Sequence, residues 1–482
     1  MIVTLALRTL LNHPIRTAVL AGGFGLGVAV MAALLGIGQV ILEQARSPAL
    51  VGGGDIVVTG AAGRITTAKF VVGSVLGQPP LVSQVTAVAP SQRGSLVLFR
   101  GDRTVPIRVR GGVPSRERAL GDAETSGEPA WTDTPADKAW SAPEPGDVLR
   151  AMDRFHPIPD VPARQASWAE WLYFNGQSGD TRFYLAFLVG PPTAGGGRPA
   201  GVRLQLERDG RLSSYSGGTS LDDNAVGRAP DLTIGGNSVR LAGETYHITL
   251  DLEDEETRRS GGTSTRGPQR VTGVVRLTGA AGRSLAPIWI RGAGGWVSGY
   301  TVPVMAGQLD GHLEVGSQTI DLGGGTGYHD HNWGYWSGVT WRWGQVQQGQ
   351  RSFVYGRIIP PPDAADASRI PGFLAAIGPE GLIGYTTDVG IEESTSGTGP
   401  SRITVTGRGA SIDLRMTIDV VSRIATAMRP GFFGGGLDFL QLRAQYQVDG
   451  TLAGEPVSFT APGAAETFRG RKTSAAPADA RR

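Results

Sequence analysis

Short runs of alternating apolar and polar residues recur from residue 167 to about residue 470, and they constrain the fold more than any other feature. Their period of two is that of a β-strand, and helical periodicity is nearly absent. Asn175-Gly176 and Asp209-Gly210 stand between such runs, and these dipeptides favour tight hairpin turns. Glycine makes up 73 of 482 residues, about twice the usual fraction of roughly 7%. The pattern predicts a mainly β chain of antiparallel hairpins.

This strand-rich body is too long for a single small barrel. Roughly 300 residues of antiparallel strands exceed one eight-stranded barrel. We therefore expect two barrel-like halves, at residues 167–335 and 336–470, followed by a disordered tail at 471–482. Barrels of this size hold one small, mostly apolar ligand in their mouths.

The N-terminal segment, residues 1–49, contains 26 consecutive uncharged residues at 17–42. About 20 apolar residues span a bilayer as a helix, whereas a cleaved signal peptide has an apolar core of about 7–15 residues. We therefore expect an uncleaved transmembrane helix. Arg8 and Arg16 precede it, which places the N-terminus in the cytoplasm by the positive-inside rule. The prediction is a single-pass protein of a bacterial plasma membrane with extracytoplasmic barrels.

The region between this helix and the barrels has two parts. Residues 50–122 are expected to form a small α+β fragment with strands near 56–59, 95–99 and 104–110. Residues 123–166 contain many prolines among acidic and small residues, and they predict an extended, poorly packed linker.

Charge and composition exclude several classes of function. The chain has 45 basic and 43 acidic residues, and no basic stripe of the kind that binds nucleic acid. The absence of cysteine removes disulfides and thiolate nucleophiles. We find no phosphate-binding loop, no nucleophile elbow and no dinucleotide fingerprint, so we expect no cofactor.

Residues 323–336 concentrate more groups able to do chemistry than any other stretch. A strand period of two divides six of them between two faces, with Tyr328, Asp330 and Asn332 on one and His329, His331 and Trp333 on the other. If the first face lines an apolar cavity, desolvation raises the carboxyl pKa and Asp330 becomes a candidate proton donor. The alternative is a buried structural network in which Asp330 is ionised.

His329 and His331, two residues apart, could also be metal ligands on one face of a strand. Such a site needs a third ligand, and His156, His247 and His312 cannot be placed from the sequence, so we expect no metal.

Three further charged residues have open roles. Glu170 lies between Trp168 and Trp171 and is either a second carboxylate of the site or part of a salt bridge at the barrel end. Glu466 and Arg469 are expected to lock the final strand in place.

The first 120 residues or so resemble the start of an ABC-transporter permease of the macrolide-exporter type. The resemblance rests on residues 5–17, the glycine-rich span after them, and the region through 113–118. In that family the first helix leads into an extracytoplasmic domain and three more membrane helices, and no second stretch of comparable apolarity occurs in this chain. We therefore do not expect this chain to transport anything alone, and we interpret the segment as either a vestigial or a partner-dependent module, with ABC-transporter subunits as the candidate partners.

A second resemblance covers about residues 150–470. It is carried in order by residues 153–157, 168–176, 327–334 and 465–470. These resemble the lipocalin-like family that includes carotenoid 1,2-hydratases (hydroxyneurosporene synthases) and AttH-type proteins. The resemblance implies two consecutive calycin-type barrels. For hydratases it also implies acid-catalysed addition of water to an isoprenoid double bond, in which Asp330 protonates the alkene beside Tyr328 and aromatic faces shelter the cation.

The chain departs from the hydratase pattern at residues 299–304. Hydratases carry a histidine and a tryptophan there, whereas in this chain the histidine is missing and the tryptophan is either absent or replaced by Tyr300. AttH-type proteins are encoded beside permeases and are thought to handle lipophilic molecules.

Two functions therefore stay open. One is a membrane-anchored module that binds a lipophilic ligand, which we favour, and the other is a hydro-lyase that uses Asp330. In both cases the residues expected to contact the ligand are Trp168, Glu170, Trp171, Tyr300, His329, His331, Asn332, Trp333, Trp336 and Trp341.

Overall fold

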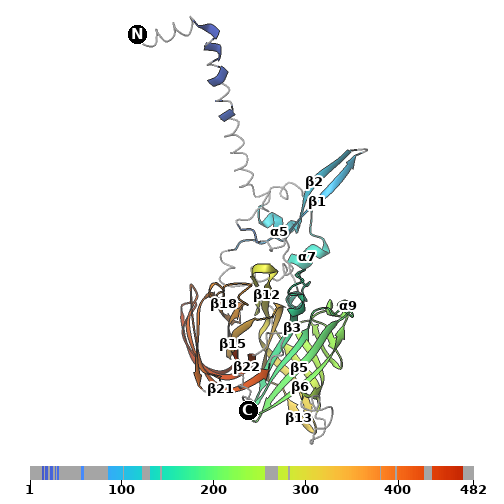
Figure 1. Ribbon diagram of the computed structural model, residues 1–482, viewed down its shortest axis with the longest axis vertical. Coiled ribbons are helices and arrows are strands. Elements are labelled where there is room, and N and C mark those ends of the chain that lie inside the picture. The colour runs from blue at the N-terminus through green and yellow to red at the C-terminus, as the bar shows by residue number, and fades with distance from the viewer. Residues whose placement is uncertain are drawn as a thin grey trace, which may run out of the picture. The chain divides into compact units, whose positions relative to one another are not determined.

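The structure is a computed structural model (Figure 1). It describes residues 13–15, 17–19, 22–24, 28, 30–31, 56–58, 85–100, 103–121, 131–141, 144–255, 270–279, 283–379, 381–396, 399–427 and 437–470. The chain divides into two compact units, residues 1–65 with 86–141 and residues 66–85 with 142–482. Much of the expected membrane helix and the whole expected tail lie outside the described residues. Within the described residues, no helix has the length and apolar character that crossing a bilayer requires.

The first unit contains an antiparallel hairpin and two short helices. These elements are β1 (Ser91–Arg100), β2 (Arg103–Gly112), α5 (Pro114–Ala119) and α7 (Pro135–Ser141). The strands predicted near 95–99 and 104–110 are confirmed, and they pair from Ser91↔Gly112 to Arg100↔Arg103. Residues 56–58 are not in a strand, so the prediction there is wrong.

The predicted linker is better packed than its proline content suggested. It contains α8 (Pro145–Met152) and η2 (Gln165–Ser167), and α8 buries Val148, Leu149 and Met152. Proline disrupts a helix interior but fits its first turn, where the backbone N–H has no partner in any case. Pro145 therefore begins this helix.

Strands from β3 to β14 form the first sheet of the second unit. They are β3 (Trp168–Ser178), β4 (Thr181–Val189), β5 (Arg198–Arg208), β6 (Arg211–Leu221), β7 (Leu232–Ile234), β8 (Asn237–Ala242), β9 (Thr245–Asp254), β10 (Arg270–Thr278), β11 (Leu285–Arg291), β12 (Val297–Val315), β13 (Gln318–Asp321) and β14 (Gly325–Tyr335), with α9 (Asp223–Val226) and η3 (Ala293–Gly295) between them. The order β10-β12-β14-β3-β4-β5-β6-β9 closes on itself, because β9 also pairs with β10. The result is an antiparallel barrel.

Two turn predictions have different outcomes. Asp209 and Gly210 join β5 to β6 with positive φ angles of 51° and 71°, as a tight Asp-Gly hairpin requires. Asn175-Gly176 is not a turn, because β3 continues through it to Ser178. Gly176 is needed there for space, since a Cβ would lie 2.5 Å from the ring of Phe183.

The second sheet comprises the remaining strands. They are β15 (Thr340–Gln348), β16 (Arg351–Ile359), β17 (Phe373–Gly378), β18 (Gly381–Thr386), β19 (Asp388–Ser396), β20 (Gly399–Gly409), β21 (Ile412–Ala427), β22 (Leu437–Leu452) and β23 (Glu455–Gly470), with η4 (Ala367–Arg369) after β16. Their order is β18-β17-β16-β15-β23-β22-β21-β20-β19. The sheet curls so that β17 and β18 contact β19, β20 and β21, which makes a second, half-closed barrel (Figure 1).

Apolar side chains fill the two barrels and also the space between them. One buried cluster draws on β3, β4, β5, β6, β9, β10 and β12, and another on strands of the second sheet. A third cluster, rich in tryptophan and tyrosine, includes residues of both sheets and joins the barrels. The predicted mainly β fold of two consecutive lipocalin-like barrels is confirmed.

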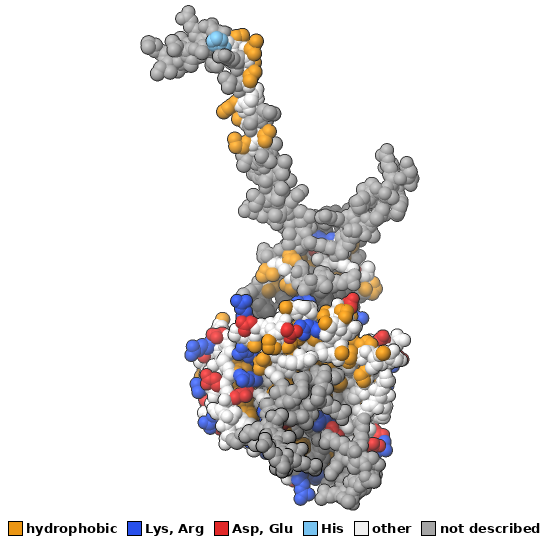
Figure 2. Space-filling model, viewed as in Figure 1, with side chains coloured by type: hydrophobic (Ala, Val, Ile, Leu, Met, Phe, Trp, Pro, Cys, Tyr) orange, Lys and Arg blue, Asp and Glu red, His pale blue; other side chains and the backbone are white. Residues whose placement is uncertain are grey.

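The surface of the barrel unit carries charges of both signs. In Figure 2, basic and acidic side chains alternate with one another over the face in view. Several are paired, such as Arg402 with Asp419 at 2.6 Å and Arg276 with Asp310 at 2.8 Å.

Candidate functional site

The chemistry-rich stretch forms β14, which lies between β3 and β12 in the first barrel. Asp330 faces Tyr173 across the pair with β3, and Asn332 faces Trp171 on one side and Tyr300 on the other. Because cross-strand partners share a face of the sheet, these side chains all project toward the second barrel.

A directed series of hydrogen bonds ends at Asp330. Trp343 Nε1 donates to the hydroxyl of Tyr300 (3.0 Å), which lies 2.7 Å from the hydroxyl of Tyr328. Tyr328 donates to Asp330 Oδ2 (3.0 Å), and Asn332 Nδ2 donates to Asp330 Oδ1 (2.7 Å). When the hydroxyl of Tyr328 donates its hydrogen bond to Asp330, the hydroxyl of Tyr300 donates to Tyr328.

The Asp330 carboxyl is only 4% exposed. Burial raises its pKa well above the ordinary value of 3.8, and the carboxyl of Glu466 raises it further. The hydrogen bonds from Tyr328 and Asn332 oppose this shift and only partly offset it. Asp330 is therefore an acid that keeps its proton at pH values where an exposed aspartate is ionised.

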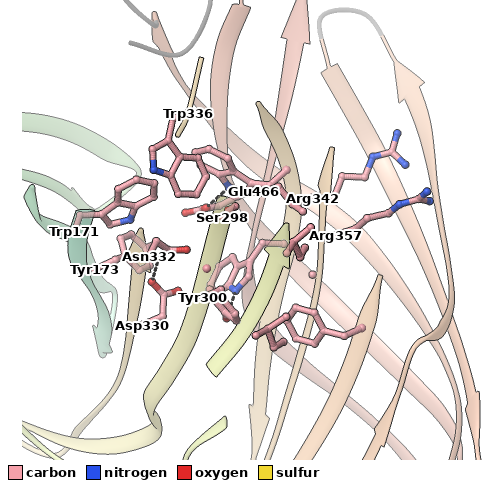
Figure 3. A pocket seen from close by; sticks show the side chains of 18 of the residues that line it. Trp171, Tyr173, Ser298, Tyr300, Asp330, Asn332, Trp336, Arg342, Arg357 and Glu466 are labelled. Atoms are coloured by element: carbon pink, nitrogen blue, oxygen red, sulfur yellow. Dashed lines mark hydrogen bonds between the residues drawn. The ribbon is translucent and has the colours of Figure 1, made fainter. Parts of the chain in front are cut away.

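A cavity of about 530 Å³ lies in front of Asp330, between the two barrels (Figure 3). The first barrel contributes Asp330, Asn332 and Tyr300 to its wall, and the second contributes Glu466. The large aromatic residues of the wall are Trp171, Tyr173, Tyr184, Trp289, Trp336, Trp341, Trp343, Phe373, Tyr385 and Phe439. Its size lies in the range of roughly 300–1,000 Å³ typical of small-molecule pockets. This cavity lies between the two barrels, whereas the sequence predicts a ligand site in the mouth of one barrel.

Glu466 is a second buried carboxyl in the same wall. It lies on β23, opposite Trp343 of β15 and Gln441 of β22. Trp341 Nε1 donates to its Oε2 at 3.0 Å. Burial raises the pKa of Glu466 to about 7, and the nearby polar groups of Trp341, Tyr173 and Gln441 offset only part of this shift.

Glu466 is expected to lock the last strand, and its hydrogen bond from Trp341 does connect β23 to β15, but its side chain also lines the cavity. Arg469 does have the expected role, as it pairs with Asp438 on the neighbouring strand at 3.3 Å.

The opposite face of β14 belongs to a separate buried network. His331 Nδ1 lies 2.9 Å from the carbonyl oxygen of Met152, and its Nε2 lies 2.9 Å from Glu170 Oε1. Both neighbours accept hydrogen bonds, so both ring nitrogens donate and the ring is an imidazolium. Burial lowers the pKa of His331, but the hydrogen bond and charge of Glu170 outweigh it and the pKa is raised. The pKa of Glu170 is lowered, because its histidine partners outweigh the effect of burial.

His329 lies in the same network, on the side nearer the barrel core. Its Nδ1 faces the carbonyl oxygen of Tyr173 and its Nε2 faces Asp153 Oδ2, both at 2.9 Å. Tyr246 donates to the same carboxylate oxygen, and the ring stacks on Phe174 at 4.1 Å. These contacts fix the end of α8 against the strands of the first barrel.

Three residues of this network could hold a metal ion. The ligand atoms of His156, Glu170 and His331 lie within 4.8 Å of one another. In the structure they bind each other instead, with His156 Nδ1 at 2.8 Å from Glu170 Oε1. His329 is not part of this group, so the pair of histidines considered from the sequence does not form a site.

The ten residues expected to contact the ligand divide between the two faces of the sheet. Trp171, Tyr300, Asn332, Trp336 and Trp341 line the cavity with Asp330. The remaining five, Trp168, Glu170, His329, His331 and Trp333, are buried behind it. Tyr328 acts through its hydrogen bond to Asp330.

The two tryptophans among those five have clear packing partners. Trp333 stacks on His156 at 4.1 Å, with Gly299 leaving room for its ring, and Trp168 meets the edge of Tyr335 at 5.2 Å. Sequence reasoning missed Tyr173, Trp343 and Glu466 as cavity residues. Tyr173 and Trp343 lie in aromatic strand runs that signal burial, but nothing local in the sequence shows which face meets the other barrel.

Comparison with known proteins gave matches in solved structures alone. No family model and no curated protein matches the chain. An AttH-type protein of Nitrosomonas europaea aligns at 14% identity over 62% of this chain and 92% of its own, with a TM-score of 0.41. Kievitone hydratase from Nectria haematococca aligns at 11% identity over 65% and 94%, with a TM-score of 0.40. CghA in complex with Sch210972 aligns at 12% identity over 68% and 96%, with a TM-score of 0.38.

Proposed function

We propose that this protein binds a lipophilic, unsaturated small molecule between its two barrels and adds water to it, with Asp330 as the proton donor. The observation that carries the proposal is a buried, hydrogen-bonded carboxyl with a raised pKa that faces an aromatic cavity. A neutral carboxyl is the group needed to protonate a carbon–carbon double bond near pH 7, where an exposed aspartate is ionised.

The surroundings of Asp330 suit both stages of such a reaction. Protonation of a trisubstituted alkene leaves a tertiary cation, and the π-faces of Trp171, Trp336 and Trp343 can stabilise that charge in a dry site. The carboxylate left behind keeps its two hydrogen bonds, from Tyr328 and Asn332. Each is stronger when the acceptor is charged, so the product of proton transfer is stabilised.

A second candidate function is binding without conversion, as in a carrier. It is favoured by the mostly apolar wall and by the fact that both oxygens of Asp330 already accept hydrogen bonds. The two functions differ in the fate of the ligand.

Incubation with an acyclic isoprenoid, followed by mass spectrometry, separates them. The full-length protein should convert geranylgeraniol to a product heavier by one water. Asp330→Asn should lower the rate at least about 100-fold, the usual contribution of a general acid. Asp413→Asn, at an exposed aspartate of β21, is the matched control and should retain the rate. Saturable quenching of tryptophan fluorescence without any hydrated product would instead support a carrier.

Anchoring in a membrane beside ABC-transporter subunits is also proposed here, from the N-terminal sequence. Large apolar side chains of its described residues, including Ile15, Val19 and Phe24, are exposed. The protein should stay in the membrane pellet after alkaline carbonate washing, and deletion of residues 1–49 should release it. Release of the intact chain by the wash would contradict the proposal.

A further inference from the structure

We propose that Glu466 is the base that accepts a proton from the water added to the substrate, so that the two barrels supply the acid and the base separately. This inference rests on the proposed hydration and assigns a residue to its second half. Asp330 belongs to β14 of the first barrel and Glu466 to β23 of the second.

One oxygen of Glu466 is available for this role. Oε2 accepts the hydrogen bond from Trp341, whereas Oε1 is buried and has no hydrogen-bond partner within the part of the chain that the structure describes. Leaving a buried polar atom unpaired costs roughly 1–3 kcal/mol, so such an atom in a cavity wall calls for a partner from the ligand or the solvent.

Two neighbouring groups share this property. The hydroxyl of Tyr173 and Oε1 of Gln441 are buried in the same wall and likewise lack a partner among the described residues. Gln441 pairs directly with Glu466 across β22 and β23, and Tyr173 pairs with Asp330 across β3 and β14. In Figure 3, Tyr173 lies on the same side of the cavity as Asp330 and Asn332.

These three groups match the hydrogen-bonding capacity of one water molecule. A buried water forms about three hydrogen bonds to polar groups that are otherwise unsatisfied. The water would donate to Glu466 Oε1 and to Gln441 Oε1, and it would accept from the hydroxyl of Tyr173. Its remaining lone pair is then free to attack a cation formed next to Asp330.

The bonds and protons of this reaction balance. The alkene π electrons take the proton of Asp330 to form a C–H bond, which leaves a cation on the adjacent carbon and a carboxylate on Asp330. The water oxygen forms the C–O bond, and one of its protons passes to Glu466 Oε1. The alcohol leaves, and return of the proton from Glu466 to Asp330 through solvent restores both groups.

Asp330 is poorly suited to perform both steps. Once deprotonated, its two oxygens hold the hydrogen bonds from Tyr328 and Asn332, which stabilise the carboxylate and weaken it as a base. A base on the other barrel removes this conflict.

The test is incubation of the full-length protein with geranylgeraniol in deuterium oxide, with separate analysis of alcohol and recovered alkene. Wild type should give alcohol that carries one carbon-bound deuterium. Glu466→Gln, which keeps the acceptor for Trp341, should form alcohol at least about 100-fold more slowly. Its cation should lose a proton instead, so the recovered alkene should carry deuterium or a shifted double bond. Glu455→Gln, at an exposed glutamate of the same strand, is the control.

A second variant protects the test against misfolding of Glu466→Gln. Tyr173→Phe removes the hydroxyl that positions the water and leaves both carboxyls in place, so it should also lower the ratio of alcohol to labelled alkene. Alcohol formation by Glu466→Gln at the wild-type rate would overturn the inference and leave the proposed function standing. Loss of both alcohol and label in a folded variant would overturn it too, since Glu466 would then be needed before water adds. If the wild-type protein forms neither the alcohol nor the labelled alkene, the proposed function itself is refuted.

Discussion

Asp330 and Glu466 are carboxyl groups that the fold removes from water. For both, burial is the largest cause of a raised pKa, and the Glu466 carboxyl adds to the shift of Asp330. A single ordinary hydrogen bond contributes about 0.5–1.5 kcal/mol net, which is too little to offset the desolvation of a buried charge. Protonation of either group removes the free-energy cost of burying its charge. In the proposed function, protonated Asp330 is the acid.

The pH dependence of stability should reveal Glu466. Its pKa is about 7 in the folded chain against an ordinary value of 4.5, so between these pH values the folded state binds more protons than the unfolded state. Stability must then fall as the pH rises through this window, by on the order of 3 kcal/mol for this group. Glu466→Gln should lose this part of the dependence.

Urea unfolding of wild type and Glu466→Gln at pH 4.5 and pH 8 measures the effect. The variant should gain stability relative to wild type at the higher pH. Parallel pH profiles for the two proteins would show that Glu466 is not buried as described.

Successive side chains of β14 point to opposite faces of the sheet, and the two faces have different roles. One face points into the cavity, and the other holds His329 and His331 in hydrogen bonds to Asp153 and Glu170. These bonds connect β14 to β3 and to the end of α8, and they fix the position of the strand that carries Asp330. The predicted alternation of faces is confirmed by this arrangement.

Removal of one partner from this network should be strongly destabilising. His331→Leu removes one of the two histidines bound to Glu170, which keeps His156 as a partner, and should lower the free energy of unfolding by about 1.5–3 kcal/mol. The double variant His331→Leu with Glu170→Leu should lose more, because Glu170 also accepts hydrogen bonds from the backbone N–H and the ring of His156. Urea unfolding gives both values. Equal stability of His331→Leu and wild type would contradict the ion pair.

The whole barrel unit depends on the contact between its two sheets. The shared cluster contains Trp171 and Tyr328 from the first barrel and Trp343 and Val354 from the second. With about 1.5–3 kcal/mol for each fully buried large side chain, this interface supplies several kcal/mol that neither barrel has alone. The cavity exists only where the two barrels meet.

The two barrels should therefore unfold in one cooperative transition. Calorimetry should give a single endotherm for the barrel unit, with equal calorimetric and van't Hoff enthalpies. Trp343→Ala should weaken the interface and separate the transition into two. Two well-resolved transitions in the wild-type protein would contradict this coupling.

Local sequence was enough to predict the strands, the Asp209-Gly210 turn and the two faces of β14. These features depend on the backbone period and on residues next to one another in the chain. The same reasoning placed Asp330 on a face with Tyr328 and Asn332, where the structure has it. It failed at Asn175-Gly176, because packing against Phe183 overrides the turn preference.

The position of the cavity and the partners of its residues depend on packing between distant segments of the chain. No local pattern could show that the cavity lies between the barrels, that Glu466 faces Asp330's cavity, or that Asp153 pairs with His329. A pKa shift by desolvation depends on how completely water is excluded, and strands far apart in the chain exclude it here. The sequence therefore fixes which groups β14 presents on each face, while the meeting of the two sheets makes one of those groups an acid.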